Sequence, residues 1–398
     1  MRIMRMFISL ILGFLLLTSI SVKAGDTVKN FVFSDKKIVK HTSVKDQQRT
    51  GTCWSYAATS FIEAELIRMG YGESDLSEMY FVRNAYSAKG NRFVRFHGEA
   101  NFSQGGQAHD VLMQINKLGF VPETDYKGNK YGSDTHVHSE MAAVLSGMLE
   151  AVVKNKNRKL STAWNPSFEA VLDTYMGKRP ASIEVNGKQY NPAEFAKATG
   201  FDADNYIELT SYSHHPYYES FVLEIPDNWT HTKYYNLPVE ELMQVMKNAI
   251  ENDYSVCWDG DVSEKGFSHN NNLAILPQIK IEDLTDSEKS KWSGMSTNER
   301  RKQMYSFENP VPEIEVTQEL RQETFDNYVS TDDHLMHMVG KSKDQNGTSY
   351  YLIKNSWAES NDMGGYLYMS EEYVKLKTVA IMIHKDALPK KIAKKLGL

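Results

Sequence analysis

The sequence contains little cysteine, with two residues in 398, Cys53 and Cys257. Two thiols allow at most one disulfide, and exported proteins commonly use cysteines in this way. A structural protein with a Cys53–Cys257 bridge is therefore one hypothesis. Cys257 lies in the apolar, strand-like run YSVCWDGDV, where a buried and unreactive thiol is expected. Cys53 lies at the start of a helical pattern, and its position needs a separate explanation.

The sequence also lacks an excess of positive charge and a pattern of metal ligands. Its formal net charge is −6, which makes it a poor candidate for binding nucleic acid. Four of the histidines outside the strand-rich part have no matching carboxylate or cysteine spacing: His136, His138, His214 and His215. We interpret them as solvated loop residues and expect no metal and no organic cofactor.

Long apolar runs are absent after the N-terminal segment, so no later stretch is expected to span a membrane. Residues 1–24 contain two arginines, an apolar run and the small-residue site Val22-Lys23-Ala24. This pattern predicts a signal peptide cleaved after Ala24, and an uncleaved membrane anchor is the alternative. The mature protein is expected in the periplasm or outside the cell, and cleavage would change its net charge to −9.

The remaining chain contains enough apolar residues for a large core, because 41% of the sequence is hydrophobic and 11% is aromatic. We expect a single domain over residues 25–398. Four segments differ in pattern: a helical part with Cys53, a mostly helical insertion, a strand-rich part and a short basic tail, over residues 25–120, 121–235, 236–390 and 391–398.

Apolar residues at helical spacing predict a helix that begins near Trp54 and is amphipathic, with further helices over 108–118 and 239–250. Residues 279–330 are highly charged and are interpreted as a surface excursion. Short apolar or alternating runs after residue 334 predict strands separated by turns. Helices before the middle of the chain and strands at its end predict an α+β fold.

Cys53 has the sequence context of a nucleophile. A thiol at a helix N-terminus lies at the positive end of the helix dipole, which favours the thiolate. A catalytic cysteine also needs an imidazole and a group that orients the imidazole. The C-terminal strands offer His334 and Asn355, and Gln47 could stabilise an oxyanion together with the Cys53 backbone N–H. His337 is the rival to His334, but three residues along a strand the two rings point to opposite faces.

These residues lie in segments that resemble the papain-like cysteine peptidases: DQQRTGTCWSYA, DHLMHMVG and YYLIKNSWAES followed by GGYLYM. The resemblance covers about residues 40–390. It implies an N-terminal helical lobe with the catalytic helix and a C-terminal antiparallel β lobe. It also assigns His334 as the catalytic histidine, Trp357 as a shield of the His334–Asn355 hydrogen bond, and Gly105 and Gly106 of SQGGQ as the segment that holds substrate backbone.

More narrowly, the chain resembles the bleomycin hydrolase and aminopeptidase C branch, which implies aminopeptidase activity on peptides and a homohexamer. The chain departs from this pattern in three ways. It is predicted to begin with a signal peptide, it has Thr50 where secreted relatives commonly have a disulfide cysteine, and only nine residues follow Pro389. Without that disulfide, packing is expected to hold the loop. The branch uses a longer C-terminal arm to bind the substrate's free amine.

The leading hypothesis is therefore an exported thiol aminopeptidase that uses Cys53, His334 and Asn355. The short tail makes an endopeptidase an alternative, because an open cleft would admit longer chains. A peptide-binding protein without catalytic activity is the other alternative. The tail sequence PKKIAKKLGL is compatible with a frayed end or with a weakly amphipathic helix.

Overall fold

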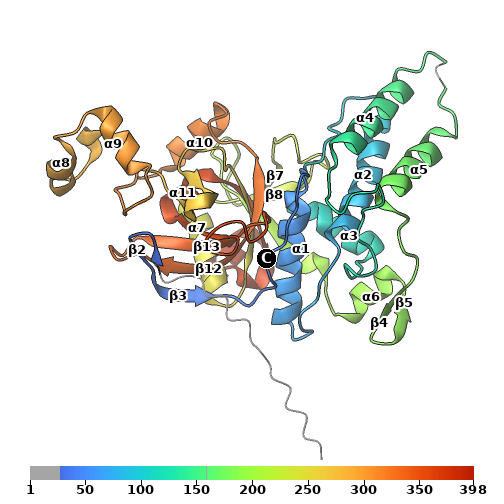
Figure 1. The fold of residues 1–398 in the computed structure, drawn as a ribbon, viewed down its shortest axis with the longest axis horizontal. Coiled ribbons are helices and arrows are strands. Elements are labelled where there is room, and N and C mark those ends of the chain that lie inside the picture. Colours follow the sequence, from blue (N-terminus) through green and yellow to red (C-terminus); the bar gives the residue numbers. More distant parts are fainter. Residues whose placement is uncertain (1–26, 158) are drawn as a thin grey trace, which may run out of the picture.

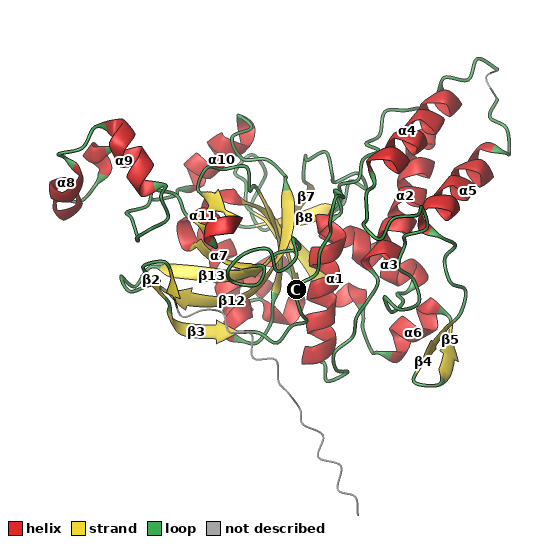
Figure 2. Cartoon of the chain, viewed as in Figure 1, coloured by secondary structure: helices red, strands yellow, loops and turns green. Residues whose placement is uncertain are grey.

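The computed structural model describes residues 27–157 and 159–398. The predicted signal peptide and its cleavage site at Ala24 lie outside the described residues. Within these residues, none of the helices combines the length and the apolar character that a membrane span requires. The α+β fold class predicted from the sequence is confirmed, with helices gathered beside a large mixed sheet (Figure 2).

The helices of the described residues fall into an N-terminal group and a group that surrounds the sheet. The first group is α1 Cys53–Arg68, α2 Glu78–Arg95, α3 Ala108–Leu118, α4 Ser139–Val153, α5 Trp164–Met176 and α6 Pro192–Ala198. The second group is α7 Val239–Glu251, α8 Asp286–Trp292, α9 Thr297–Met304, α10 Gln318–Asp326, α11 Glu371–Lys377 and α12 Lys390–Leu396.

Most strands belong to one sheet, and two short hairpins stand apart from it. The hairpins are β1 Thr27–Val28 with β2 Phe31–Val32, and β4 Ile183–Val185 with β5 Lys188–Tyr190. The sheet consists of β3 Ser34–Ile38, β6 Tyr206–Thr210, β7 Ser220–Val222, β8 Lys233–Asn236, β9 Val256–Gly260, β10 Phe267–Ser268, β11 Leu273–Ala274, β12 His334–Lys343, β13 Ser349–Lys354, β14 Tyr366–Ser370 and β15 Thr378–His384.

The sheet has the strand order β10-β11-β14-β13-β12-β9-β15-β6-β8-β7, and β3 also pairs with β12. Neighbouring strands are antiparallel except for the parallel pairs β11–β14 and β6–β8. The long strand β12 lies between β13 and β9, and its first residue, His334, is opposite Gly260. This register places the two strand ends that carry His334 and Asp259 side by side.

Alternating residues of the central strands enter two different cores. Cys257, Leu335 and Met382 pack with α1 and the N-terminal helices. Trp258 and Met336, their neighbours in sequence, pack with α7. Helices α1 and α7 therefore cover opposite faces of the sheet.

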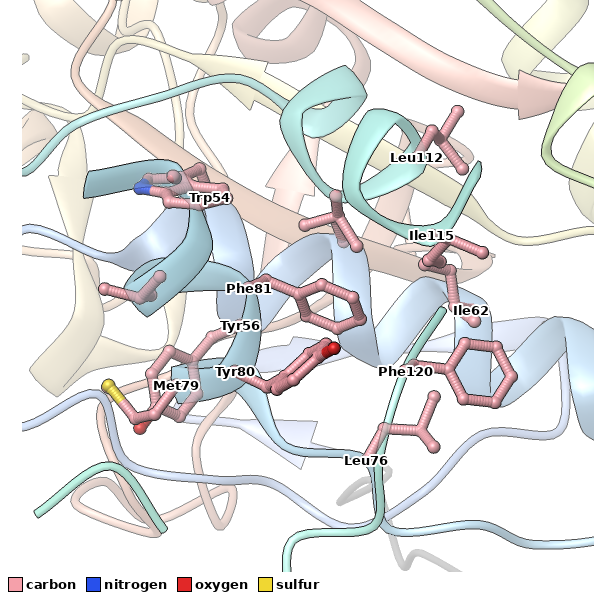
Figure 3. Packing of buried hydrophobic residues seen from close by; sticks show 14 of the residues in the cluster. Trp54, Tyr56, Ile62, Leu76, Met79, Tyr80, Phe81, Leu112, Ile115 and Phe120 are labelled. Atoms are coloured by element: carbon pink, nitrogen blue, oxygen red, sulfur yellow. The ribbon is translucent and has the colours of Figure 1, made fainter. Parts of the chain in front are cut away.

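Helix α1 lies between the sheet and the lobe formed by α2–α6 (Figure 1). Its residues from Cys53 to Leu66 are all buried, including two glutamates. Figure 3 shows Ile62 of α1 beside Ile115 and Phe120 of the helical lobe. The amphipathic helix predicted from the sequence is therefore buried on both sides, which is typical of a central helix.

The insertion over residues 121–235 contains α4, α5 and α6 and also contributes β6, β7 and β8 to the sheet. The charged excursion contains α8 and α9, which project from the rest of the protein (Figure 1). They pack around a small core with Trp292 at its centre. The basic tail forms α12 and is not frayed, because Ile392 and Leu396 are buried in the core beside α7.

Candidate active site

Cys53 is the first residue of α1, and the loop before it is held by Thr50. The Thr50 hydroxyl donates to the Gln47 carbonyl at 2.7 Å, and the Thr50 carbonyl accepts from Gln47 Nε2 at 2.8 Å. A further hydrogen bond of 2.6 Å joins the hydroxyls of Thr50 and Thr52. The sequence predicted that packing would replace the missing disulfide, but specific hydrogen bonds from Thr50 hold the loop.

The start of α1 has the donors that an oxyanion needs. The N-cap residue Thr52 makes no side-chain capping hydrogen bond. The first N–H groups of the helix are therefore not bonded to its hydroxyl. Gln47 lies beside them, with Oε1 accepting from Ser356 Oγ at 2.7 Å and its backbone N–H donating to the Ser356 carbonyl at 2.8 Å. One hydrogen of Gln47 Nε2 bonds Thr50, which leaves its second hydrogen for a ligand.

His334 begins β12, and Asn355 follows β13 on the neighbouring strand. His334 Nε2 and Asn355 Oδ1 are 2.8 Å apart. Because the Ser356 N–H also donates to Asn355 Oδ1, at 2.8 Å, the amide oxygen is turned toward the imidazole. An amide oxygen only accepts, so Nε2 carries the proton of the neutral ring and Nδ1 has the free electron pair. This tautomer leaves Nδ1 as the basic nitrogen.

Trp357 packs over the imidazole, with ring centroids 4.8 Å apart. On its other side it contacts His269, at 5.1 Å between ring centroids. Asn355 Nδ2 bonds His269 Nδ1 at 3.3 Å. Trp357 therefore contacts His334 and His269 contacts Asn355, and the hydrogen-bonded pair is buried.

The sulfur of Cys53 lies against the strand that carries His334. It accepts a hydrogen bond from the backbone of Leu335, the residue after His334. Within the described residues, no hydrogen bond joins the sulfur directly to the imidazole. Burial raises the pKa of the Cys53 thiol to about 12, and the carboxylates of Asp332, Asp259 and Asp227 act in the same direction.

Burial also lowers the pKa of His334 to about 4, against the opposing effect of its bond to Asn355. Both directions favour an uncharged thiol and an uncharged imidazole at neutral pH. These directions oppose the thiolate expected from the helix dipole, because desolvation and nearby carboxylates favour the neutral thiol. His334 must then remove the thiol proton when the sulfur reacts.

This protonation state leads to a testable prediction. We expect no ultraviolet absorbance of a Cys53 thiolate from pH ~5 to ~9. The absorbance is measured as the difference between the Cys257→Ala protein and the Cys53→Ala/Cys257→Ala protein. The two pKa shifts act in the same sense, since a raised thiol pKa keeps the proton on the Cys53 sulfur and a lowered imidazole pKa keeps His334 uncharged. A thiolate step near or below neutral pH would contradict this assignment.

Gly105 and Gly106 lie beside the residue next to the nucleophile. Trp54 Nε1 donates to the Gln104 carbonyl at 2.9 Å, and a Cβ on Gly106 would lie 3.1 Å from the Trp54 ring. A Cβ on Gly105 would lie 1.8 Å from Asp227 Oδ2. Only glycine fits at these positions, and Gly105 is half-exposed.

The two rivals to the catalytic assignment have other partners. His337 Nδ1 bonds Ser60 Oγ at 2.8 Å, two helical turns after Cys53. Cys53 and Cys257 are both free cysteines, so the hypothesis of a structural disulfide protein is wrong. Cys257 is buried between strands, as its sequence context predicted.

The other histidines differ from the sequence interpretation. His138 is completely buried and not solvated, and burial lowers its pKa to about 3. His214 Nε2 and His215 Nε2 both bond the carboxylate of Glu224, at 3.2 and 2.8 Å. These three side chains, partly or largely exposed, bring ligand atoms of a kind that binds metals within 4.8 Å of one another. Glu224, at the start of the β7–β8 connection, supplies a carboxylate that the sequence spacing did not indicate.

Sequence reasoning missed the carboxylates of Asp227, Asp259 and Asp332 near the sulfur. Asp332 is two residues before His334, and Asp259 is in the strand opposite Leu335. The signal was a charged residue inside the apolar run VCWDGDV, which is unusual in a buried strand. Nothing local to Asp227 indicates its contact with Gly105.

Comparison with known families agrees with this arrangement of a helix cysteine and a strand histidine. A model described as papain family cysteine protease matches residues 29–197, and a model described as Peptidase C1-like family matches residues 270–397. The first match contains Cys53 and the second contains His334 and Asn355. The chain belongs to the papain-like cysteine peptidases.

Relatives of this peptidase span nearly its whole length. It is 21% identical to aminopeptidase C of Streptococcus thermophilus, over 94% of the chain and 86% of that protein. It is 22% identical to aminopeptidase C of Lactobacillus delbrueckii subsp. lactis, over 88% of the chain and 81% of that protein. The crystal structure of PepW from Lactobacillus rhamnosis HN001 has the same fold, with a TM-score of 0.69, 17% identity and coverage of 92% of this chain and 84% of PepW.

Proposed function

We propose that this peptidase is an exported aminopeptidase that hydrolyses peptides with Cys53 as the nucleophile. The proposal rests on the His334–Asn355 hydrogen bond of 2.8 Å. The Cys53 sulfur lies beside it, hydrogen-bonded to the backbone of Leu335. Export is supported by the signal-peptide pattern of residues 1–24. Aminopeptidase activity is supported by the curated relatives named aminopeptidase C.

In the proposed reaction, His334 Nδ1 takes the thiol proton as Cys53 Sγ attacks the carbonyl carbon of the peptide bond. The second hydrogen of Gln47 Nε2 and the Cys53 N–H bind the resulting oxyanion. The imidazolium then gives its proton to the leaving amine, and an acyl-enzyme remains. A water molecule, deprotonated by His334, attacks the acyl group and releases the acid and the thiol.

Asn355 and Trp357 act on the imidazole in this scheme. Asn355 Oδ1 accepts from Nε2–H in both the neutral and the protonated ring, so the ring keeps one orientation through the proton transfers. Trp357 covers this bond and limits competition from water. No step in this scheme requires a metal or an organic cofactor.

The experiment that tests the proposal compares one peptide with a free N-terminus and the same peptide acetylated, with the wild-type protein and with Cys53→Ala. We expect the wild type to release the first residue of the free peptide only, and the variant to release none. Hydrolysis by Cys53→Ala would overturn the mechanism. Equal cleavage of both peptides would overturn the aminopeptidase assignment.

An endopeptidase is the second candidate, and the position of α12 favours it. The C-terminal helix is buried against the α7 side of the sheet, with Lys395 Nζ bonded to Tyr218 OH at 2.9 Å. Helix α1 covers the opposite side. Helix α12 is therefore held in the core on the side of the sheet opposite the helix that begins with Cys53.

A further inference from the structure

The segment Gln104–Gln107 lies directly beside the nucleophile. The Gly51 N–H donates to Gln104 Oε1 at 2.8 Å, and Trp54 Nε1 donates to the Gln104 carbonyl at 2.9 Å. These two contacts come from either side of Cys53 in the sequence. A side chain that borders Gln104–Gln107 is therefore close to any substrate that reacts with the Cys53 sulfur.

Two carboxylates border the segment from different parts of the chain. Asp227 comes from the β7–β8 connection and approaches Gly105 with Oδ2, while its Oδ1 accepts from Asn101 Nδ2 at 3.0 Å and from Ser103 Oγ at 3.2 Å. Asp332 Oδ2 accepts from Gln107 Nε2 at 2.9 Å. One oxygen of Asp227 therefore remains at the glycine edge with no described donor.

A third carboxylate, Asp259, completes the cluster and lacks a compensating charge. It is 3% exposed and lies opposite Leu335, whose backbone contacts the nucleophile. Among the described residues, no nitrogen or hydroxyl group donates to either of its oxygens. Its polar neighbour is the carboxyl of Asp332. Buried acids in such a position are ordinarily paired with a donor or a cation.

The buried cation in this region, Lys89, compensates only part of this group of acids. Lys89 donates to the backbone carbonyls of Ser103 and Gly105 and lies near the faces of Trp54 and Trp229. Its ammonium is thus behind the glycine segment, and its electrostatic partners are Asp110 and Asp227. Asp259 and Asp332 receive no ion pair from it. Burial raises the pKa of Asp259 well above its usual value and that of Asp332 to about 7, because desolvation and nearby acids disfavour their charged forms. An incoming cation would favour the ionised carboxylates and compensate their charge.

We propose that Asp227, Asp259 and Asp332 form a pocket that binds the free α-ammonium group of the substrate peptide. This inference rests on the proposed function. In an aminopeptidase substrate the α-nitrogen is two covalent bonds from the carbonyl carbon that Cys53 attacks, so its binding group must lie next to the nucleophile. The three acids occupy such a position.

The pocket also couples recognition to reactivity. The three carboxylates contribute to the raised pKa of Cys53, so they oppose formation of a thiolate when no substrate is present. A bound ammonium group compensates this negative charge, and the thiol proton becomes easier to remove. The nucleophile is thereby activated by the substrates that the pocket selects.

Asp227→Asn and Asp332→Asn test the proposal because they remove charge and keep the shape of the side chain. For a peptide with a free N-terminus, kcat/KM is expected to fall by about 10- to 100-fold in each variant, as for loss of a charge-assisted hydrogen bond. The exposed Asp125→Asn is the matched control and is expected to remain within about 2-fold of wild type. Reaction of Cys53 with an uncharged thiol reagent monitors the fold and is expected to be equal or faster in the pocket variants.

Equal losses for free and acetylated peptides would overturn the proposal. A loss confined to peptides with an internal lysine or arginine would also overturn it, since the pocket would then bind a side chain. Calorimetric binding to Cys53→Ala separates this proposal from the proposed function. If the pocket is correct, the free peptide binds more tightly than the acetylated peptide even if the wild-type protein cleaves neither, and Asp227→Asn removes the difference.

Discussion

Replacement of Cys53 by alanine is expected to lower peptide hydrolysis by at least ~10⁴-fold, because the covalent intermediate then has no nucleophile. Gln47→Ala should be milder, at ~10²- to 10³-fold, since the backbone N–H at the helix start still binds the oxyanion. The measurement is kcat for one peptide substrate, with the thermal unfolding midpoint recorded for each variant.

Cys257→Ala is the matched control for the loss of a thiol. Both thiols are buried, with Cys257 1% and Cys53 9% exposed, but Cys257 lies in β9 and not at the helix start. We expect hydrolysis by this variant to stay within a few-fold of wild type. The assignment fails if the two alanine variants lose activity equally, or if Cys53→Ala retains hydrolysis.

Lys377→Met is expected to reduce the free energy of unfolding by about 3–5 kcal/mol, because it leaves Asp261 buried without its cation. Lys377 Nζ lies 3.2 Å from Asp261 Oδ2, and both side chains are fully buried. Although burial opposes it, hydrogen bonds from Ser263 and the charge of Lys377 hold the pKa of Asp261 below its usual value. Denaturant unfolding of the variant measures the loss.

The same pair supports the segment that leads into His334. Lys377 Nζ donates to the Val329 carbonyl at 2.9 Å, and the Thr331 N–H donates to Asp261 Oδ2 at 3.2 Å. The variant is therefore expected to lose activity together with stability. Asp261→Asn added to Lys377→Met should recover part of the stability, because no buried charge remains unpaired.

An exposed ion pair provides the comparison for Lys377. Lys289 lies 3.9 Å from Asp286 in α8, and both side chains are open to solvent. Lys289→Met is expected to change stability by less than about 1 kcal/mol. A comparably small effect of Lys377→Met would show that the buried pair contributes no more than a surface pair.

The sequence predicted α1 and the two segments that supply Cys53 and His334, because these depend on local apolar spacing. It could not predict that α1 is buried on both sides. Glu63 and Glu65 suggest a solvated face, but Glu63 accepts from Lys45, Thr42 and the Leu76 N–H, and Glu65 pairs with Arg68 and Tyr206. Most of these partners come from other segments, so the burial is decided by tertiary contacts.

The protonation state of the nucleophile was also beyond the sequence. A helix start is a local feature and correctly marks where the sulfur lies. The carboxylates of Asp259 and Asp332 reach it only through the register between β9 and β12, and Asp227 reaches Gly105 across a long stretch of chain. Desolvation depends on all of these neighbours together, so it cannot be read from spacing alone.

The position of α1 has a consequence for how the protein unfolds. One helix supplies side chains to the core of the helical lobe and also packs against residues of β9 and β12. Separation of the lobes would expose nearly every side chain of that helix to water, at a large hydrophobic cost. The lobes on either side of the nucleophile are therefore expected to melt in a single transition, and inactivation by heat should coincide with loss of all secondary structure.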